Sequence, residues 1–189
     1  MKIGCGFWLQ WMLVTIVGFL VSLYWIEVGE SPDVRALEGA IGGCAIGLAQ
    51  WFVLRQKFYK VLGWVLASII GWGLIGGSGL GALGWIAPTV TSIPLRAFYG
   101  AMNGAVVGTL FGVAQGLILN NQIYRAWRWI LANTIGWALG LALGWTLGAV
   151  LRGVTGLFLG EVVGLILAWL IVAATTGVAL GHVARASVQ

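Results

Sequence analysis

Long uncharged stretches divide the chain into six segments that are apolar on every helical face. A helix needs about 20 apolar residues to cross the hydrocarbon core of a bilayer. The second stretch is extended at its start by Ala36 and Leu37, and each of the others is long enough. We therefore expect six transmembrane helices. The uncharged stretches cover residues 3–26, 39–54, 61–95, 97–124, 129–151 and 162–184.

The third stretch is too long for one helix. The glycines and serine at 76–79, followed by Pro88 and Pro94, are typical of a turn and a loop. We therefore expect a span over about 61–83 and a loop before Arg96. Transmembrane β-strands are excluded, because runs such as 13–17 are apolar on both faces instead of alternating.

Charge differs between the two sides that this topology defines. Both ends of the chain and the connections at 55–60 and 120–128 carry seven Lys and Arg residues and no acid. The other three connections carry three bases and all five acids. Because positive loops stay in the cytoplasm, we expect both termini to be cytoplasmic. No charge falls within an expected span, and we expect Glu161 at the membrane interface.

Composition excludes a soluble enzyme. Of the 189 residues, 60% are hydrophobic and only 8% are charged, against about 25% charged in typical soluble domains. The ten Lys and Arg residues form no cluster, which argues against nucleic-acid binding. The sequence has no G-x-x-x-x-G-K-[ST], G-x-S-x-G or H-E-x-x-H motif and no pair of carboxylates within a span. We therefore expect a non-enzymatic protein surrounded by the lipid bilayer.

The chain contains an internal repeat. When residues 39–74 are aligned with 104–139 without a gap, 15 of 36 positions are identical. The identical residues include glutamine, tyrosine and tryptophan, which rarely coincide by chance. We conclude that this part of the chain arose by duplication.

Weaker similarities extend the repeat in both directions. Residues 177–185 resemble 47–55, and residues 11–18 resemble 64–71. A two-helix unit keeps its orientation when it is repeated, so the copies would be parallel. The alternative is one duplication flanked by two unrelated helices. We expect a single all-α membrane domain with pseudo-threefold symmetry, built from helical hairpins at about 3–54, 61–119 and 127–185.

Glycine recurs at every fourth position in several spans. Small residues at this spacing form a stripe that lets the backbones of neighbouring helices approach closely. We expect the stripes to pack helix against helix, with a glycine-lined pore or sliding interface as the alternative. The glycines concerned are Gly39, Gly43, Gly47, Gly104, Gly108, Gly112, Gly136, Gly140 and Gly144.

Gln50 and Gln115 occupy equivalent positions in the repeat. An amide without a partner is costly in hydrocarbon, so each should hydrogen-bond to a neighbouring helix. The residues that we expect as partners are Ser68, Asn133 and Thr134. The alternatives are a polar solute site or ligation of a pigment magnesium.

His182 is the only histidine, and one histidine cannot build a zinc site. We predict no cofactor and no metal. Chlorophyll or carotenoid, held by His182, Gln50 or Gln115, is the alternative to interfacial solvation of the histidine. Cys5 and Cys44 should lie at opposite membrane depths, so we expect no disulfide between them.

The tryptophans form two sets by their distance from the ends of the spans. One set lies near the ends and predicts interfacial belts: Trp8, Trp11, Trp25, Trp64, Trp127 and Trp129. The other set lies deeper and either fills space beside the glycines or stacks on a flat ligand: Trp72, Trp137 and Trp145.

The repeated motif GxxxGxxxGxxQ, followed by WxLAxxIGW, is present at Gly39–Trp72 and again at Gly104–Trp137. In this motif the chain resembles an uncharacterised family of Gly- and Trp-rich polytopic bacterial membrane proteins of cyanobacterial type. The resemblance covers about residues 39–145, and Leu180 departs from it where a third glutamine would stand. It implies a polytopic fold in a bacterial inner membrane or thylakoid. The family has no established activity, so the resemblance implies nothing about the activity of this chain.

Two functions from different classes fit these features. The first is an accessory or scaffold subunit of a larger membrane complex, whose partners are other membrane subunits or further copies of the chain. A photosynthetic assembly is one such complex. The second is a small channel or facilitator for a neutral solute, with a path along the bundle axis past Gln50 and Gln115.

Overall fold

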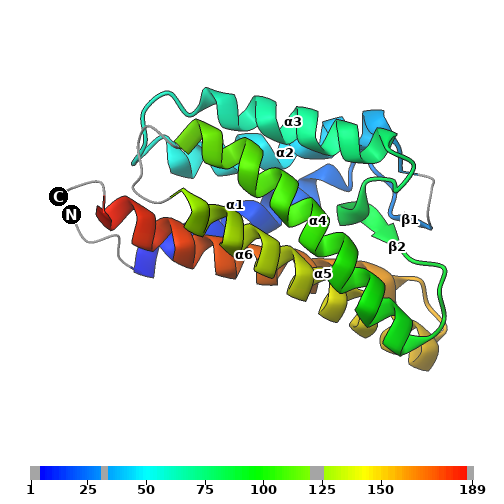
Figure 1. The fold of residues 1–189 in the computed structure, drawn as a ribbon. Coiled ribbons are helices and arrows are strands. Elements are labelled where there is room, and N and C mark those ends of the chain that lie inside the picture. Colours follow the sequence, from blue (N-terminus) through cyan, green and yellow to red (C-terminus); the bar gives the residue numbers. More distant parts are fainter. Residues whose placement is uncertain (1–4, 31–33, 120–125, 187–189) are drawn as a thin grey trace.

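The computed structural model describes residues 5–30, 34–119 and 126–186, with side chains described as far as His182 (Figure 1). Helices dominate this part of the chain. Two of the bases in the orientation argument, Lys2 and Arg125, lie outside the described residues. The helices are α1 (Cys5–Ser22), α2 (Ala36–Leu54), α3 (Leu62–Gly77), α4 (Ile93–Leu119), α5 (Trp127–Thr155) and α6 (Leu159–Ala186).

Five of these helices are long and apolar enough to cross a membrane. The chain therefore has the helices of an integral membrane protein, as the uncharged stretches predict. The remaining helix, α3, is equally apolar but has only 16 residues. At 1.5 Å per residue it is about 24 Å long, which is shorter than the roughly 30 Å hydrocarbon core of a bilayer.

The expected span over 61–83 is wrong at its C-terminal end, because α3 stops at Gly77. Gly79 and Gly81 follow with φ of +84° and +73°, a left-handed conformation that side chains disfavour. The chain then forms a 3₁₀ turn, η1 (Leu83–Trp85), and the two-residue strand β2 (Ile86–Ala87). This strand pairs in parallel with β1 (Gly29–Glu30), a contact that the sequence pattern did not predict.

The fourth helix starts earlier than the charges indicate. It begins at Ile93, so Pro94 lies in its first turn instead of in the preceding loop. Proline is tolerated there, because the first N–H groups of a helix have no partner within it. Arg96, which we expected to precede the span, is therefore part of α4 and is buried.

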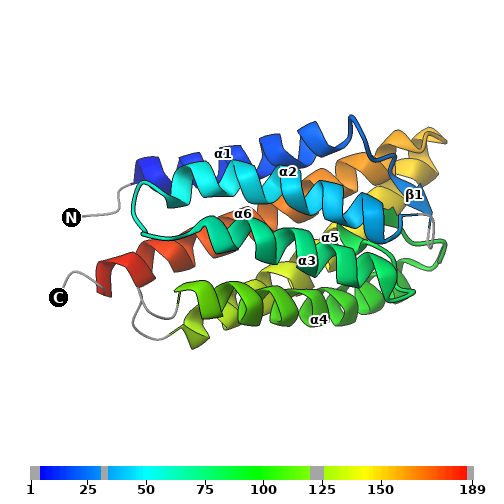
Figure 2. The same ribbon diagram turned by 90° about the horizontal axis from the view of Figure 1, so that it is seen from above.

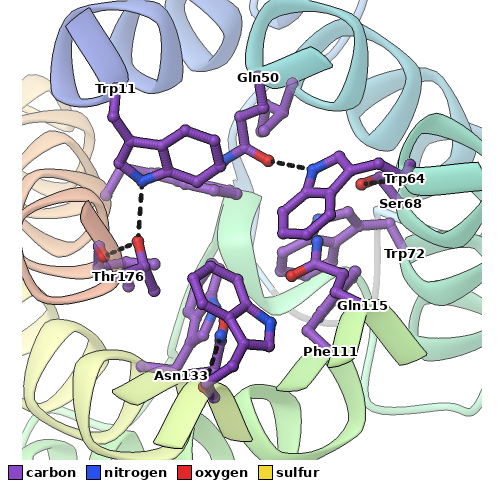
Figure 3. A pocket seen from close by; sticks show the side chains of 14 residues that line it. Trp11, Gln50, Trp64, Ser68, Trp72, Phe111, Gln115, Asn133 and Thr176 are labelled. Atoms are coloured by element: carbon purple, nitrogen blue, oxygen red, sulfur yellow. Dashed lines mark hydrogen bonds between the residues drawn. The ribbon is translucent and has the colours of Figure 1, made fainter. Parts of the chain in front are cut away.

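The helices form a closed ring. Each packs against its neighbours in the chain, and α1 packs against α6 to complete the circle (Figures 2 and 3). The start of α1 and the end of α6 lie at the same end of the bundle, and β1 and β2 lie at the other (Figure 1). The contact between α3 and α4 is the thinnest in the ring, whereas α2–α3, α4–α5 and α5–α6 are extensive.

The glycine stripes lie in these extensive contacts. The stripe of α2 faces α3, the stripe of α4 faces α5, and the stripe of α5 faces α6. A methyl group at Gly112 would lie 2.7 Å from Ile130 Cα, and one at Gly140 would lie 2.8 Å from the carbonyl oxygen of Ala168. Only glycine permits this approach, so the stripes bring backbones together and do not line a pore.

Substitution along the α4 stripe should reveal this constraint. We expect Gly112→Ala to destabilise the protein by about 1–3 kcal/mol, because α5 must move away from the new methyl group. Gly116→Ala is the matched control: its methyl group would lie 3.7 Å from the nearest atom, on Trp129. This control should be neutral or slightly stabilising, since alanine favours helix. Thermal unfolding in detergent measures both, and equal losses would contradict the packing argument.

Candidate functional site

A small polar cavity lies on the axis of the ring (Figure 3). Its volume is about 20 Å³. All six helices contribute to its wall, and most of the contributed side chains are aromatic or carry an amide or hydroxyl group. The lining residues are Trp11, Ile46, Gln50, Trp64, Ser68, Trp72, Phe111, Gln115, Trp129, Asn133, Trp137, Trp169, Val172 and Thr176.

Three tryptophans close the cavity toward the end of the bundle where α1 begins and α6 ends. Trp11, Trp64 and Trp129 come from α1, α3 and α5 and are at most 1% exposed. Their ring centroids are 5.9 Å apart for Trp11 and Trp64, 5.4 Å for Trp64 and Trp129, and 6.4 Å for Trp11 and Trp129. The expectation that these three belong to an interfacial belt is wrong, because they point into the ring and not toward lipid. Trp25 and Trp127 are exposed, as belt residues would be.

Gln50 sits at the centre of a hydrogen-bond chain beside this layer. Its amide nitrogen donates to Thr15 Oγ1 at 3.1 Å. Its carbonyl oxygen accepts from Trp64 Nε1 at 2.9 Å, as Figure 3 shows. The partners expected from the sequence were wrong, since Ser68 donates to the carbonyl of Trp64 instead. The missed signal was the spacing of 14 residues between glutamine and tryptophan, which recurs from Gln115 to Trp129.

Gln115 does not repeat this arrangement. Its side chain is buried and faces the cavity, but it makes no hydrogen bond within the described part of the chain. Trp129 Nε1 is also buried and has no partner there. The expected partners of Gln115 are engaged elsewhere, since Asn133 donates to the carbonyl of Trp129 and Thr134 to that of Ile130. Gln50 and Gln115, which match in the sequence repeat, therefore both line the axial cavity but differ in their hydrogen bonds.

A second aromatic layer closes the cavity on the opposite side. Trp72 and Trp137 lie 5.2 Å apart, and Trp169 lies within 5.8 Å of both. Trp85 packs on this layer and donates to Ser22 Oγ at 2.8 Å, and Trp169 donates to the carbonyl of Gly84 at 3.1 Å. Two of the three deep tryptophans, Trp72 and Trp137, thus fill space against each other and Trp169. The third, Trp145, is buried in the same core, and its Nε1 has no partner in the described part of the chain. Trp85 and Trp169 were not singled out from the sequence, because nothing there showed that η1 folds into the ring.

His182 lies apart from the axial cavity. It is exposed near the end of α6, and its Nδ1 lies 2.8 Å from the carbonyl oxygen of Val178. The structure therefore brings Gln50 and Gln115 to one cavity but leaves the histidine outside it. Cys5 and Cys44 are both free.

A buried ion pair lies at the β1–β2 end of the bundle. Arg96 contacts both carboxylate oxygens of Glu161 at 2.8 and 2.9 Å, and the two residues are 4% and 2% exposed. Arg96 also donates to the carbonyls of Pro88, Val90 and Trp145. The expectation that no span holds a charge is wrong, because Arg96 and Glu161 lie near the starts of α4 and α6, two helices long and apolar enough to cross a membrane, and both side chains are buried within the protein. Their sequence signal was weak, because each residue stands at the edge of an uncharged stretch.

A larger pocket opens beside this ion pair. It has a volume of about 340 Å³ and is lined by Thr89, Thr91, Ala149 and Gly153 together with four charged residues. Besides Arg96 and Glu161, these are Arg152 and Glu30, whose half-exposed side chains pair at 2.6 Å. Positive and negative groups balance, so the pocket is polar without a net charge. Glu30, in strand β1, thus contributes to the wall of this pocket.

The described residues contain no group of three or more His, Cys, Asp or Glu side chains able to hold a metal ion. A pigment does not fit the axial cavity in this arrangement, because about 20 Å³ accommodates little more than one water molecule. Gln50 has both ends of its amide engaged within the bundle. The site can therefore hold a very small neutral polar molecule.

Comparison with known proteins returns no match among family profiles, curated proteins or solved structures. The resemblance to a bacterial membrane-protein family stays a prediction.

The Gln50 chain should stabilise the fold measurably. We expect Gln50→Leu to cost about 1–3 kcal/mol, because it leaves Trp64 Nε1 buried without an acceptor. Adding Trp64→Phe removes that donor. The free energy of unfolding of the double variant should therefore fall by less than the sum of the decreases in the two single variants. A thermodynamic cycle from unfolding in detergent measures the coupling. Additive losses would show that the bond contributes nothing.

The buried ion pair should matter more than the exposed one. We expect Glu161→Gln to cost about 3–5 kcal/mol, because it leaves the Arg96 charge buried without its counter-ion. The control is Glu30→Gln, which weakens the half-exposed pair with Arg152 and should have a far smaller effect. Unfolding midpoints of the two variants test this order, and an equal or reversed order would refute it.

Proposed function

We propose that this protein is a non-enzymatic integral membrane protein that serves as an accessory or scaffold subunit of a larger membrane complex. The observation that carries the proposal is the filled interior. Two aromatic layers occupy the bundle axis and leave about 20 Å³ between them. A rigid, sealed bundle suits a structural role better than a transport or catalytic one.

Helix α3 supports this proposal and indicates where a partner binds. Its outward stripe of Leu62, Leu66, Ile70 and Leu74 is between 56% and 70% exposed. A helix too short for the bilayer is accommodated by thinning of the membrane or by association with another protein. A partner on α3 would cover this stripe and also the thin seam between α3 and α4.

We also propose a pseudo-threefold arrangement, with units α2–α3, α4–α5 and α6–α1. The extensive α2–α3 and α4–α5 contacts coincide with the two aligned repeats, and α6 closes on α1. Three sets of residues at matching repeat positions lie around the axis. They are Trp11, Trp64 and Trp129; Thr15, Ser68 and Asn133; and Phe19, Trp72 and Trp137. In this arrangement the repeat unit is the pair α2–α3 and not the hairpin α3–α4.

The proposed orientation places both termini in the cytoplasm of a bacterium, or on the equivalent side of a thylakoid. The excess of Lys and Arg at that end supports it. The ion pairs of Glu161 and Glu30 then lie at the opposite face.

A facilitator for a small neutral solute is the second candidate. The polar cavity between Gln50 and Gln115 favours it, because amide groups at this depth would replace the hydration of a passing molecule. This function requires the aromatic layers to open, since Trp11, Trp64 and Trp129 block the axis in the arrangement described.

Photocrosslinking in native membranes tests the scaffold proposal. A benzophenone amino acid at Ile70 on α3 should give a discrete, reproducible adduct larger than the 20.0 kDa chain. The matched control is Leu13 on α1, which is similarly exposed and apolar but should contact only lipid. Purification in mild detergent should yield the same partner with the unmodified chain. A monomeric particle with no adduct at Ile70 would refute the proposal.

Reconstitution into liposomes tests the facilitator. We expect water and glycerol to cross liposomes containing the protein no faster than protein-free liposomes, because the axis is closed. A flux that rises with protein density and falls in Gln115→Leu would favour the facilitator instead. Absorbance of the same preparation from a pigmented host decides whether chlorophyll or carotenoid accompanies the protein.

A further inference from the structure

The axial cavity contains a hydrogen-bond donor without an acceptor. Trp129 lines the cavity and is 1% exposed, and its Nε1 has no partner within the described residues. A buried indole N–H that makes no hydrogen bond is destabilising, because folding removes it from water without compensation. Trp145 Nε1 is also buried without a partner in the described part of the chain, but Trp145 does not line the cavity, so of these two donors only that of Trp129 can meet a molecule bound there.

Two unused polar groups face the same cavity. The amide of Gln115 makes no hydrogen bond in the described part of the chain, and that side chain is 6% exposed. Asn133 uses its amide nitrogen to donate to the carbonyl of Trp129 at 3.0 Å, which leaves its Oδ1 available. A bound molecule here would meet both donors and acceptors.

The size of the cavity limits what can bind. A water molecule needs at least about 10–15 Å³ of accessible volume and two to four polar partners. The cavity offers about 20 Å³, which is enough for one water and not for two. An organic solute or a pigment is too large, and an ion would lack a counter-charge among the lining side chains.

We propose that one water molecule is bound on the axis and bridges Trp129 Nε1 to the side chains of Gln115 and Asn133. It takes the place of the direct bond that Trp64 makes to Gln50 in the other repeat. In this arrangement Gln50 accepts directly from Trp64, whereas Gln115 is joined to Trp129 through the water molecule. This difference accounts for the asymmetry between the two repeats. The bound water accepts from the indole and donates to an amide oxygen.

Nuclear magnetic resonance of the full chain in detergent micelles tests the proposal. Tryptophan labelled with ¹⁵N gives an indole N–H signal for each of the 12 tryptophans. The Trp129 and Trp64 signals are assigned from Trp129→Phe and Trp64→Phe. We expect a dipolar cross-peak from Trp129 N–H to water in rotating-frame spectra, which separate it from proton exchange. Trp64 is the internal control and should show none.

A substitution on α4 completes the test. Gln115→Leu should abolish the water cross-peak of Trp129, whereas Thr109→Val, at an exposed position on the same helix, should leave it intact. If Gln115→Leu fails to fold, an experimental structure of the native chain decides, and density for one water within hydrogen-bond distance of Trp129 Nε1 is expected. A Trp129 signal without a water contact, or density for any larger molecule in the cavity, overturns the proposal.

Discussion

Close approach of helix backbones along glycine stripes is the constraint on which the rest of this structure depends. Lipid offers no hydrophobic force to drive helix against helix, so contact must come from packing. Glycines at every fourth position let α4 lie directly on α5 and α2 on α3, as the short approach at Gly112 shows. The stripe of α5 ends at Gly148, where an added methyl group would lie 2.6 Å from Glu161 Oε2. Glycine there admits the carboxylate that holds Arg96.

Tight contacts on the flanks of the ring leave its interior to be filled by large side chains. Indole rings do this with little flexibility, and edge-to-face contacts such as that of Trp137 with Trp169 stabilise the layers. Each buried indole also brings an N–H that needs an acceptor. Thr176, Ser22 and the carbonyl of Gly84 satisfy three of them, and Gln50 satisfies that of Trp64. The polar side chains of Gln50, Ser22 and Thr176 are therefore explained by the need to satisfy buried indoles.

The two ends of the bundle differ in chemistry. One end is closed by three tryptophans, while the other holds a buried ion pair and a pocket of about 340 Å³. The pair of Arg96 and Glu161 joins α4 to α6 across the ring, which the helix packing alone does not do. Removing two charges from water is costly, so the surrounding carbonyls of Pro88 and Trp145 are needed to stabilise Arg96. The ion pair thus adds an electrostatic contact between α4 and α6 at the end of the bundle that the layer of Trp72, Trp137 and Trp169 faces.

The sequence by itself determined the helices and the stripes. The length of an uncharged stretch determines where a chain can cross a bilayer. Glycines at every fourth position determine which face of a helix is smooth. Both features depend only on residues that are close together in the sequence. It also revealed the equivalence of Gln50 and Gln115. Only the tertiary structure decided that Trp11, Trp64 and Trp129 meet on one axis, because burial depends on how the ring closes. It likewise decided the partners of Gln50, the burial of Arg96 with Glu161, and the entry of Trp85 into the core. These contacts join residues between 14 and 118 positions apart, and no local pattern specifies which distant side chain comes within reach.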